Sequence, residues 1–372
     1  MLIDAANNQG IIYRAPENMF GYNGWGSVCK DDNGVLYSVW SGNRIAHVCP
    51  LGRTYMSKSY DEGKTWSVPT VINDTPLDDR DAGIICLGGE KLLVSWFVHP
   101  AKSYLTHHRD GIVNANTDEG GKALLHAGLK NFEKYVDQPE LGGSYIRISE
   151  DGGNTWGETV RVPVSAPHGP IRLSDGSLFY MGTAMYTDAI PEGTNAAYKS
   201  YDDGKTWEKV GVPEEMVCGN GYAFEEPHAI ELPSGRILSV FRAEHWVEGD
   251  WDQPFTVVTT YSDDGGKTWS TMKHTGICGA PPHLMMHSSG ALICSVGRRC
   301  DPFGERAYVS YDCGETWEDE YILSYSDNGD LGYPASVELS DGSIFTMFYQ
   351  RFAPEDGKNR SILWTKWKLK DR

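Results

Sequence analysis

The sequence predicts an all-β protein, a six-bladed β-propeller with four-stranded antiparallel blades and a small helical insertion in blade two. Three observations carry this prediction. An acidic turn motif occurs five times, an apolar hairpin pattern occurs six times, and 42 Gly and 19 Pro among 372 residues are typical of many short strands and tight turns. We expect a single domain that spans residues 1–372.

The turn motif reads S-x-D-x-G-x-T-W. It occurs as SYDEGKTW, SEDGGNTW, SYDDGKTW, SDDGGKTW and SYDCGETW, beginning at positions 59, 149, 200, 262 and 310. An Asp side chain can accept hydrogen bonds from backbone N–H groups of its own turn, and Gly permits positive φ. The motif is therefore expected to close a turn between two strands. The acidic residues expected to hold these turns without touching a substrate are Asp61, Asp151, Asp202, Asp264 and Asp312.

The second repeat is an apolar strand, a two-residue turn of the S-G or D-G kind and another apolar strand, which is a hairpin signal. Its copies lie at 78–97, 166–183, 225–242, 280–299 and 331–350, with a looser version at 11–40. Five hairpins are followed by a third strand, the turn motif and a fourth strand. The last blade has a third strand at 360–369 and no fourth strand after it. We expect residues 1–9 to complete that blade and close the ring.

An insertion of roughly residues 99–143 follows the second strand of blade two. Within it, residues 121–136 have the apolar spacing of a helix. Connectivity places the insertion over the functional face, either as a packed surface decoration or as a lid that covers a substrate.

Composition narrows the classes of partner. The formal net charge of −18 argues against nucleic acid or an anionic membrane as partner. No apolar stretch approaches the roughly 18 residues that cross a bilayer, and the N-terminus has no secretory signal pattern. We therefore expect a cytoplasmic protein, although an exported protein whose signal had been removed would look the same. The eight cysteines have no metal-binding spacing, so we expect mostly buried free thiols, no metal and no cofactor.

The propeller topology separates two faces. The turn motifs lie on one face, and the other face collects the starts of first strands, the ends of second strands and the loops that follow them. An unusual number of charged and aromatic side chains occupies this functional face. They are Arg14, Arg44, His47, Asp78, Asp79, Arg80, Asp81, His168, Glu225, Glu226, Arg242, Trp246, His283, Arg298, Arg299 and Tyr333.

These motifs resemble the sialidase (neuraminidase) superfamily, and the resemblance covers nearly the whole chain outside the insertion. YRAP at Arg14 is similar to the family's F/Y-R-I-P motif, with Ala in place of Ile. Glu226 lies sixteen residues before Arg242 across one hairpin, as the family's Glu and second Arg do. Tyr333, in GYPASVELSDG, matches the family's Tyr before an L-x-D-G turn.

The resemblance implies an exo-α-sialidase in which three guanidinium groups bind the sugar carboxylate. Arg14 and Arg242 supply two of them, and Arg299 is the best match for the third, with Arg298 the near alternative. Bidentate, charge-assisted hydrogen bonds of this kind contribute about 1.5–3 kcal/mol each. The other residues expected to contact the sugar are Arg44, Arg80, His168, His283 and Trp246, whose indole stacks either on the sugar or within its own loop.

The resemblance also implies that Tyr333 attacks the anomeric carbon while Glu226 polarises the phenol. A neutral nucleophile avoids repulsion by the substrate carboxylate, and Tyr-nucleophile sialidases are a known exception to the two-carboxylate rule. The sequence departs from the family in the blade-one loop at 41–55, which contains no Asp or Glu to act as acid/base. The candidates that remain for this role are His47, Asp79 and Asp81.

This departure leaves the substrate open. The chain is an exo-sialidase, a glycosidase or lyase for another acidic sugar such as a uronic acid, or a propeller that binds sugar without turnover. A lyase needs a base beside C5 of the sugar, whereas a binding protein needs the arginines but not Tyr333.

Overall fold

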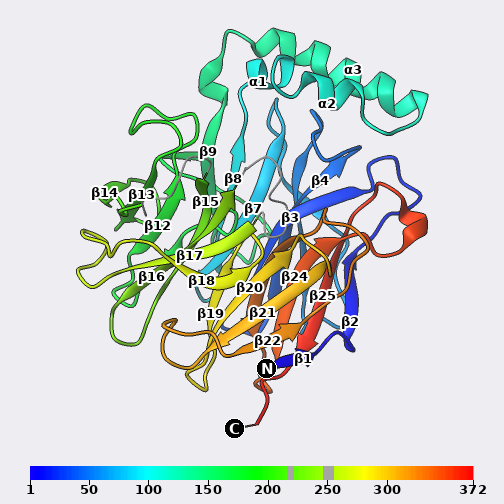
Figure 1. Cartoon of the computed structure of the whole chain (residues 1–372). Coiled ribbons are helices and arrows are strands. Elements are labelled where there is room, and N and C mark those ends of the chain that lie inside the picture. Colours follow the sequence, from blue (N-terminus) through cyan, green and yellow to red (C-terminus); the bar gives the residue numbers. More distant parts are fainter. Residues whose placement is uncertain (216–221, 246–254, 372) are drawn as a thin grey trace.

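The computed structural model describes residues 1–215, 222–245 and 255–371. These residues form six sheets arranged as the blades of a propeller, which confirms the predicted fold class (Figure 1). Consecutive strands within each blade pair antiparallel, and the first strand lies nearest the neighbouring blades, so that β3 contacts both β7 and β23. The side chains that these first strands carry therefore meet near the centre of the molecule.

The strands of blades one to three follow the predicted repeat. Blade one contains β3 (Tyr22–Lys30), β4 (Leu36–Arg44), β5 (Arg53–Ser59) and β6 (Thr70–Asn73). Blade two contains β7 (Asp79–Gly88), β8 (Lys91–Val98), β9 (Gly143–Ser149) and β10 (Val160–Val162). Blade three contains β11 (Ile171–Arg172), β12 (Leu178–Thr183), β13 (Asn195–Ser200) and β14 (Glu208–Gly211).

Blades four to six continue the ring. Blade four contains β15 (Tyr222–Glu231), β16 (Ile237–His245), β17 (Phe255–Ser262) and β18 (Lys273–Cys278). Blade five contains β19 (His283–Met286), β20 (Leu292–Arg298), β21 (Gly304–Ser310) and β22 (Asp319–Ile322). Blade six contains β23 (Gly332–Glu338), β24 (Ile344–Gln350), the short helix η3 (Pro354–Asp356) and β25 (Ser361–Trp367).

The N-terminus closes the ring, but not with the residues that we expected. Residues 1–9 were predicted to complete blade six, whereas the strand that does so is β2 (Gln9–Tyr13), antiparallel to β25. The preceding strand β1 (Leu2–Asp4) pairs parallel with β22 and adds a fifth strand to blade five. One N-terminal segment thus fastens two blades, because its short strands satisfy the open edges of both sheets.

The turn motifs have the predicted structural role. In the first motif, Asp61 accepts hydrogen bonds from the backbone N–H and the hydroxyl of Thr65, at 2.9 and 2.6 Å, while the Gly63 N–H donates to Ser59. Trp66 then packs 5.9 Å from Phe345 of the neighbouring blade. The same hydrogen bonds recur around Asp151, Asp202, Asp264 and Asp312.

The insertion after β8 forms a helical wall at one end of the molecule (Figure 1). The helix predicted at 121–136 corresponds largely to α3 (Glu119–Phe132). Asp118 is the N-cap of α3, and its carboxylate accepts a hydrogen bond from the Gly121 N–H. Leu125 and Leu129 of α3 are buried in one core cluster with Ile45 of the blade-one loop and residues of blade two. Its elements are α1 (Ala101–Leu105), α2 (Arg109–Val113), α3 (Glu119–Phe132), η1 (Glu133–Tyr135) and η2 (Pro139–Leu141).

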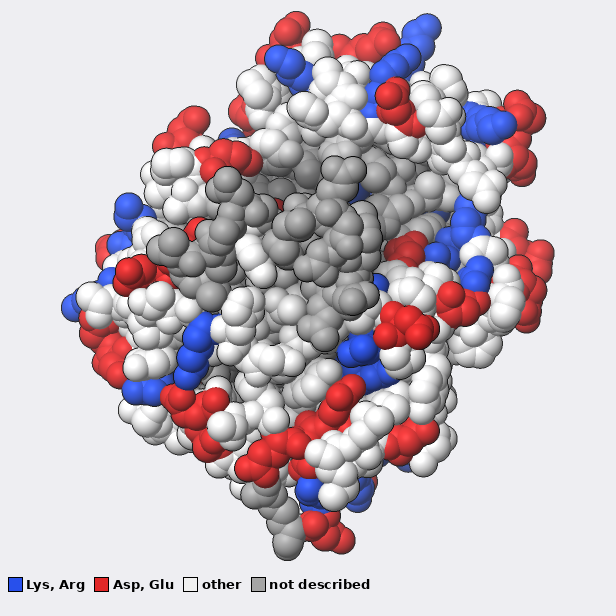
Figure 2. Space-filling model, in the orientation of Figure 1, with Lys and Arg blue, Asp and Glu red and all other residues white. Residues whose placement is uncertain are grey.

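Acidic side chains are spread over the visible surface, with basic side chains scattered among them (Figure 2). Within the described residues, no helix combines the length and the apolar character needed to cross a bilayer.

Candidate active site

Four first strands carry a backbone irregularity at equivalent positions. Trp25, Asp81, Glu226 and Tyr333 each adopt positive φ, between 49° and 53°. Each lies where the pairing register of its strand shifts, which marks a β-bulge in blades one, two, four and six. Positive φ is uncommon for non-glycine residues, and bulges of this kind redirect side chains, often at functional sites.

Tyr333, Glu226 and Arg242 form one hydrogen-bonded chain. The Tyr333 hydroxyl donates to Oε1 of Glu226, and Nη1 of Arg242 donates to Oε2 of Glu226 at 2.8 Å. Nη2 of Arg242 also donates to Glu244 of the same strand. This places the predicted nucleophile, its base and one predicted guanidinium in direct contact.

Electrostatics assign the protons within this chain. Burial by itself raises the pKa of Glu226, but the charges of Arg242 and Arg299 and the hydrogen bond from Tyr333 lower it overall. Burial and the negative charges of Glu226 and Asp81 raise the pKa of Tyr333 well above its ordinary value. The resting pair is therefore a neutral phenol and an ionised carboxylate.

Arg299, and not Arg298, joins this cluster. The Arg299 guanidinium carbon lies 5.5 Å from the centre of the Tyr333 ring, and its Nε donates to the Leu331 carbonyl at 3.0 Å. Phe255 supports two of the arginines, because the guanidinium carbons of Arg242 and Arg299 lie 4.8 and 5.6 Å from its ring centre. Arg298 instead donates to the Asp301 carbonyl at 3.3 Å.

Arg80 and Asp81 bring a third guanidinium and a third carboxyl group. The guanidinium carbon of Arg80 lies 4.5 Å from the Trp25 ring centre, and its Nε lies 3.8 Å from Oδ1 of Asp81. Burial raises the pKa of Asp81 to about 7, with the nearby Glu226 carboxylate adding to the effect and Arg80 opposing it. Neither Nε of Arg80 nor Oδ1 of Asp81 has a hydrogen-bond partner, although both atoms are buried.

Arg14 does not reach this cluster, contrary to our expectation. It follows the edge strand β2 and forms a bidentate ion pair with Asp356, with N···O distances of 2.6 and 3.1 Å, while Phe352 covers its guanidinium. The bulge position of blade one is occupied by Trp25 instead. The physical reason is that β2 ends at the rim of blade six, and the chain crosses residues 15–21 before β3 begins.

Two further predicted site residues serve the scaffold. Arg44 is fully buried and donates to both oxygens of Asp78, at 2.5 and 2.9 Å, and Tyr104 of the insertion donates to the same carboxylate at 2.5 Å. Asp79 accepts from the hydroxyl of Thr75 at 2.8 Å, so its side chain holds the preceding loop. Because side chains alternate along a strand, Asp79 points away from the side on which Arg80 contacts Trp25.

The predicted histidines of blades three and five lie deeper than expected. His168 and His283 are buried and pack with His228 at ring-centre distances between 4.4 and 5.5 Å. His228 lies two residues after the bulge residue Glu226 in β15, His283 begins β19, and His168 precedes β11. Burial lowers the pKa of all three imidazoles, to about 3 for His228, so they are neutral in the folded protein near pH 7.

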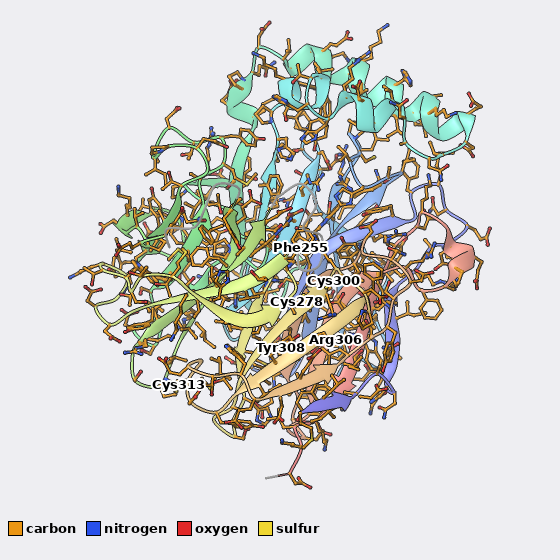
Figure 3. The ribbon with its side chains drawn as sticks, in the orientation of Figure 1. Phe255, Cys278, Cys300, Arg306, Tyr308 and Cys313 are labelled. Atoms are coloured by element: carbon orange, nitrogen blue, oxygen red, sulfur yellow. The ribbon has the colours of Figure 1, made fainter. Side chains whose placement is uncertain are left out.

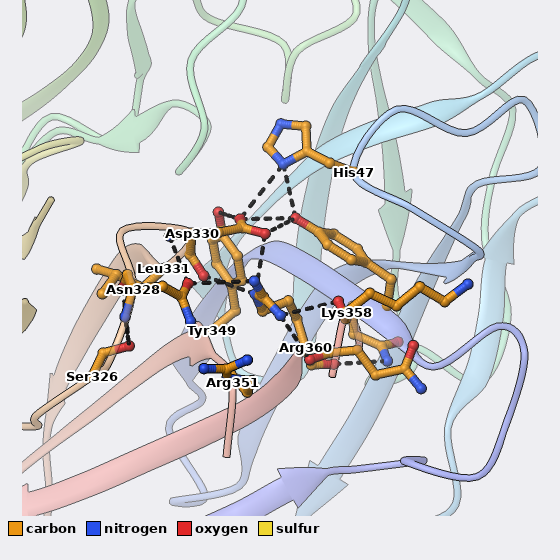
Figure 4. A network of polar contacts seen from close by, with 12 residues as sticks. His47, Ser326, Asn328, Asp330, Leu331, Tyr349, Arg351, Lys358 and Arg360 are labelled. Carbon is orange, nitrogen blue, oxygen red and sulfur yellow. Dashed lines mark hydrogen bonds and ion pairs between the residues drawn. The ribbon is translucent and has the colours of Figure 1, made fainter. Parts of the chain in front are cut away.

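His47 belongs to a network that the sequence did not indicate (Figure 4). Asp330 accepts from the hydroxyls of Tyr22 and Tyr349, at 2.9 and 3.1 Å, and pairs with Arg360 at 3.1 Å. Nδ1 of His47 lies 2.8 Å from the Tyr22 hydroxyl and 3.5 Å from Asp330.

Charges within this network set two pKa values. Burial and the nearby charges of Arg80 and Arg44 lower the pKa of His47, although Asp330 opposes them. Burial alone raises the pKa of Asp330, but His47 and Arg360 lower it overall.

Asp330 could have been found by comparing blades. It stands three residues before the bulge residue Tyr333, as Asp78 stands three residues before Asp81, and each carboxylate neutralises a buried arginine. Trp25 and Glu244 were also missed. No single-residue signal marks them, because Trp is common in cores and the sequence does not show which partner a Glu side chain meets.

A cavity of about 240 Å³ opens beside the cluster. Asp81 and Glu226 line it together with Glu225, Phe97 and Met185. Trp246 lies outside the described residues. Among the residues that are described, no group of three or more His, Cys, Asp or Glu side chains is arranged to hold a metal ion.

One known protein family matches more than half of the chain. The profile of the BNR repeat-like domain matches residues 137–346. The chain belongs to this family. Solved structures with a similar fold include sialidases and an arabinanase, in agreement with the resemblance to the sialidase superfamily. A search of the curated proteins found no match.

Three solved structures illustrate the likeness of this BNR propeller. A protein of unknown function from Dyadobacter fermentans has a TM-score of 0.74 and 20% identity, with 98% of this chain and 99% of that chain covered. The NanB sialidase from Streptococcus pneumoniae has a TM-score of 0.68 and 17% identity, covering 98% and 71%. The Penicillium chrysogenum α-L-arabinanase has a TM-score of 0.63 and 15% identity, covering 97% and 98%. At these identities the likeness establishes a glycoside-hydrolase-like propeller fold.

Proposed function

We propose that this BNR propeller is an exo-acting glycoside hydrolase that removes a terminal carboxylate-bearing sugar, with α-linked sialic acid as the first candidate. The observation that carries the proposal is the hydrogen bond from Tyr333 to Glu226 within a cluster of guanidinium groups. A buried phenol bonded to an ionised carboxylate is an activated nucleophile of the kind that nucleophilic catalysis requires.

In the proposed reaction, Oη of Tyr333 attacks the anomeric carbon and its proton passes to Oε1 of Glu226. Asp81 donates a proton to the departing glycosidic oxygen. In the second step Asp81 takes a proton from water, which attacks the anomeric carbon, and the departing oxygen of Tyr333 takes back the proton held by Glu226. Two displacements on one carbon give retention of configuration.

Asp81 fits the acid/base role better than His47. A group with a pKa near the working pH can both donate and accept a proton, and the pKa of Asp81 is about 7. Asp81 also lines the same cavity as Glu226. His47, in contrast, packs edge-on against Trp25 with ring centres 4.7 Å apart, and its Nδ1 is bound to the Asp330 network.

The charges at the site favour an anionic substrate when Asp81 and Glu225 are protonated. Arg80, Arg242 and Arg299 are balanced by Asp81, Glu226 and Glu244 when all six groups are ionised. Glu225 also lines the cavity, and burial together with the Glu226 carboxylate raises its pKa. Protons on both Asp81 and Glu225 leave one positive charge in excess, which a sugar carboxylate neutralises. The unpartnered Nε of Arg80 and the guanidinium of Arg299 are the groups proposed to bind that carboxylate.

A second candidate is a glycosidase or lyase for a uronic acid. The ion pair between Arg14 and Asp356 favours it, because one of the three arginines implied by the sialidase resemblance is engaged elsewhere. Arg80, which lies over the Trp25 ring, takes the place of that third arginine. The carboxylate of the preferred sugar therefore need not occupy the position that the carboxylate of sialic acid would occupy.

A panel of 4-methylumbelliferyl glycosides tests both candidates: the α-sialoside, the β-glucuronide and the α-L-arabinofuranoside. We expect turnover of an acidic glycoside and none of the arabinofuranoside. Turnover of the glucuronide alone would replace sialic acid by a uronic acid. An unsaturated product from a 4-linked uronic acid oligosaccharide, tested beside the panel, would identify a lyase. Saturable binding without release from any substrate would make the protein a sugar-binding propeller.

A further inference from the structure

Two cysteines from neighbouring blades lie face to face beside the candidate site. The sulfur atoms of Cys278 and Cys300 are 3.2 Å apart, although the residues are 22 positions apart in the chain. Cys278 is the last residue of β18 in blade four, and Cys300 directly follows Arg299 in the loop after β20 of blade five. Figure 3 labels the two cysteines next to each other, with Cys313 well away from both.

The backbone holds both thiols in place. The Gly279 N–H donates to the Phe255 carbonyl at 3.0 Å, and the Ala280 N–H donates to the Gly297 carbonyl at 2.9 Å. The segment after Cys278 is therefore fastened to blade four on one side and to blade five on the other. These main-chain hydrogen bonds hold Cys278 close to the blade-five strand β20, which Cys300 follows in the chain.

The pair differs from the other cysteines in the described part of the chain. Cys29, Cys49 and Cys294 are buried, Cys86 is half-buried and Cys313 is exposed. Cys29 and Cys86 interact electrostatically, but among the described cysteines only the sulfurs of Cys278 and Cys300 lie within hydrogen-bond distance of each other. Cys300 is half-buried, which makes it the more accessible partner, while Cys278 is almost completely buried. Burial raises the pKa of Cys278 to about 12, with the neighbouring Cys300 adding to the effect and Arg298 opposing it.

We propose that Cys278 and Cys300 form a reversible disulfide that ties the end of blade four to the loop carrying Arg299. The oxidant is a small disulfide such as oxidised glutathione. The Cys300 thiolate attacks one sulfur of that disulfide, forming a mixed disulfide and releasing one thiolate. The Cys278 thiolate then attacks Sγ of Cys300 and releases the second thiolate. Overall, two protein thiols lose two electrons and two protons, and the small disulfide gains them as two thiols.

The bond restrains a segment that contributes directly to the site. Cys278 pairs in register with Thr256, next to Phe255, whose ring supports Arg242 and Arg299. Cys300 is covalently adjacent to Arg299. Oxidation therefore fixes the ring and one of its guanidinium groups relative to each other, independently of which sugar the site accepts.

Peptide mapping of the wild-type protein tests the proposal directly. The purified protein is incubated with oxidised glutathione, unfolded in the presence of an alkylating agent and digested without reduction. We expect a peptide pair linked between Cys278 and Cys300, and six free thiols where the reduced protein has eight. Eight free thiols after oxidation, or linkage only to other cysteines, would overturn the proposal. This readout needs no variant and does not depend on the proposed function.

The restraint is measured by thermal unfolding and hydrogen exchange. We expect oxidation to raise Tm by roughly 3–8 °C and to slow amide exchange in residues 299–303, because a cross-link lowers the entropy of the unfolded chain. Dithiothreitol reverses both changes. In Cys278→Ser and Cys300→Ser both responses disappear, whereas Cys313→Ser retains them as the matched control. If the linked peptide is found but Tm does not change, the disulfide forms without restraining the loop, and the proposed restraint is wrong.

Discussion

The phenol of Tyr333 donates a hydrogen bond to the Glu226 carboxylate, although the residues are 107 positions apart and belong to blades six and four. Two equivalent β-bulges produce this contact, since each turns its residue out of the strand pattern. A buried phenol that donates to an ionised carboxylate among guanidinium groups is not needed for packing of the core. They suit a reaction in which the phenol becomes a nucleophile.

Replacing Tyr333 by Phe should abolish turnover while leaving substrate binding largely intact. The ring and its packing remain, but the nucleophilic oxygen is lost, so we expect kcat to fall by roughly three orders of magnitude or more. Steady-state kinetics and binding calorimetry measure the two quantities separately. Tyr349→Phe is the matched control, because that hydroxyl bonds to Asp330 and is expected to leave kcat within a few-fold. Full turnover by Tyr333→Phe would remove Tyr333 from the mechanism.

Asp81 should govern the alkaline side of the pH profile. Its raised pKa of about 7 means that it is protonated below that pH and loses its proton above it, so the rate should decline as pH rises through 7. Asp81→Asn should lose this decline and slow the hydrolysis of substrates with poor leaving groups by about 10²–10⁴-fold.

Asp79→Asn provides the control for Asp81. The pKa of Asp79 is also raised to about 7 by burial, yet its side chain is bonded to Thr75, so its replacement should leave the shape of the profile unchanged. An alkaline decline that survives in Asp81→Asn and vanishes in His47→Ala would assign the acid/base role to His47.

Arg299 and Arg14 should differ in their effect on KM. Arg299→Lys keeps the charge but loses the planar fork that holds a carboxylate, so we expect KM to rise by about tenfold or more. Arg14→Lys should leave KM unchanged, because Asp356 engages that guanidinium at the rim of blade six. Michaelis kinetics on the preferred acidic glycoside check both. Equal effects of the two substitutions would contradict the placement of Arg14 outside the site.

The buried histidines His168, His228 and His283 should make the folded protein less stable in acid. His228 has a folded pKa of about 3, below its unfolded value, so the unfolded chain binds more protons as pH falls below about 6.5. Its contribution to stability is complete above that pH and is lost at up to about 1.4 kcal/mol per pH unit below it. The raised pKa values of Asp79 and Asp81 act in the opposite sense, since those groups favour folding at lower pH.

A variant isolates the histidine effect from these carboxyls. Denaturant unfolding of the wild type and of His228→Gln between pH 6.5 and 4.5 should give a less steep loss of stability in the variant. The carboxyl contributions are common to both proteins and cancel in the difference. Parallel curves would show that His228 is not held neutral in the fold.

Local patterns were sufficient to predict the propeller. The turn around Asp61 is held by hydrogen bonds within a few residues, and a hairpin such as 225–242 reveals itself by alternating apolar residues and a tight turn. The convergence of Glu226, Arg242 and Tyr333 followed from their equivalent places in the repeat. These features depend on sequence spacing alone, and the structure places them where the spacing implies.

Other features depend on which groups meet across the ring. Arg14 had a suitable motif, but Asp356 binds it at the rim, and blade one presents Trp25 instead. Asp330 gains its partners from two blades, Tyr22 and His47 from blade one and Tyr349 and Arg360 from blade six. The thiols of Cys278 and Cys300 also meet across two blades. The amino-acid sequence by itself determined the number of blades and which strand ends face the site. Only the tertiary structure decided which charges neutralise each other, because ion pairing in a buried setting depends on distances that no repeat encodes.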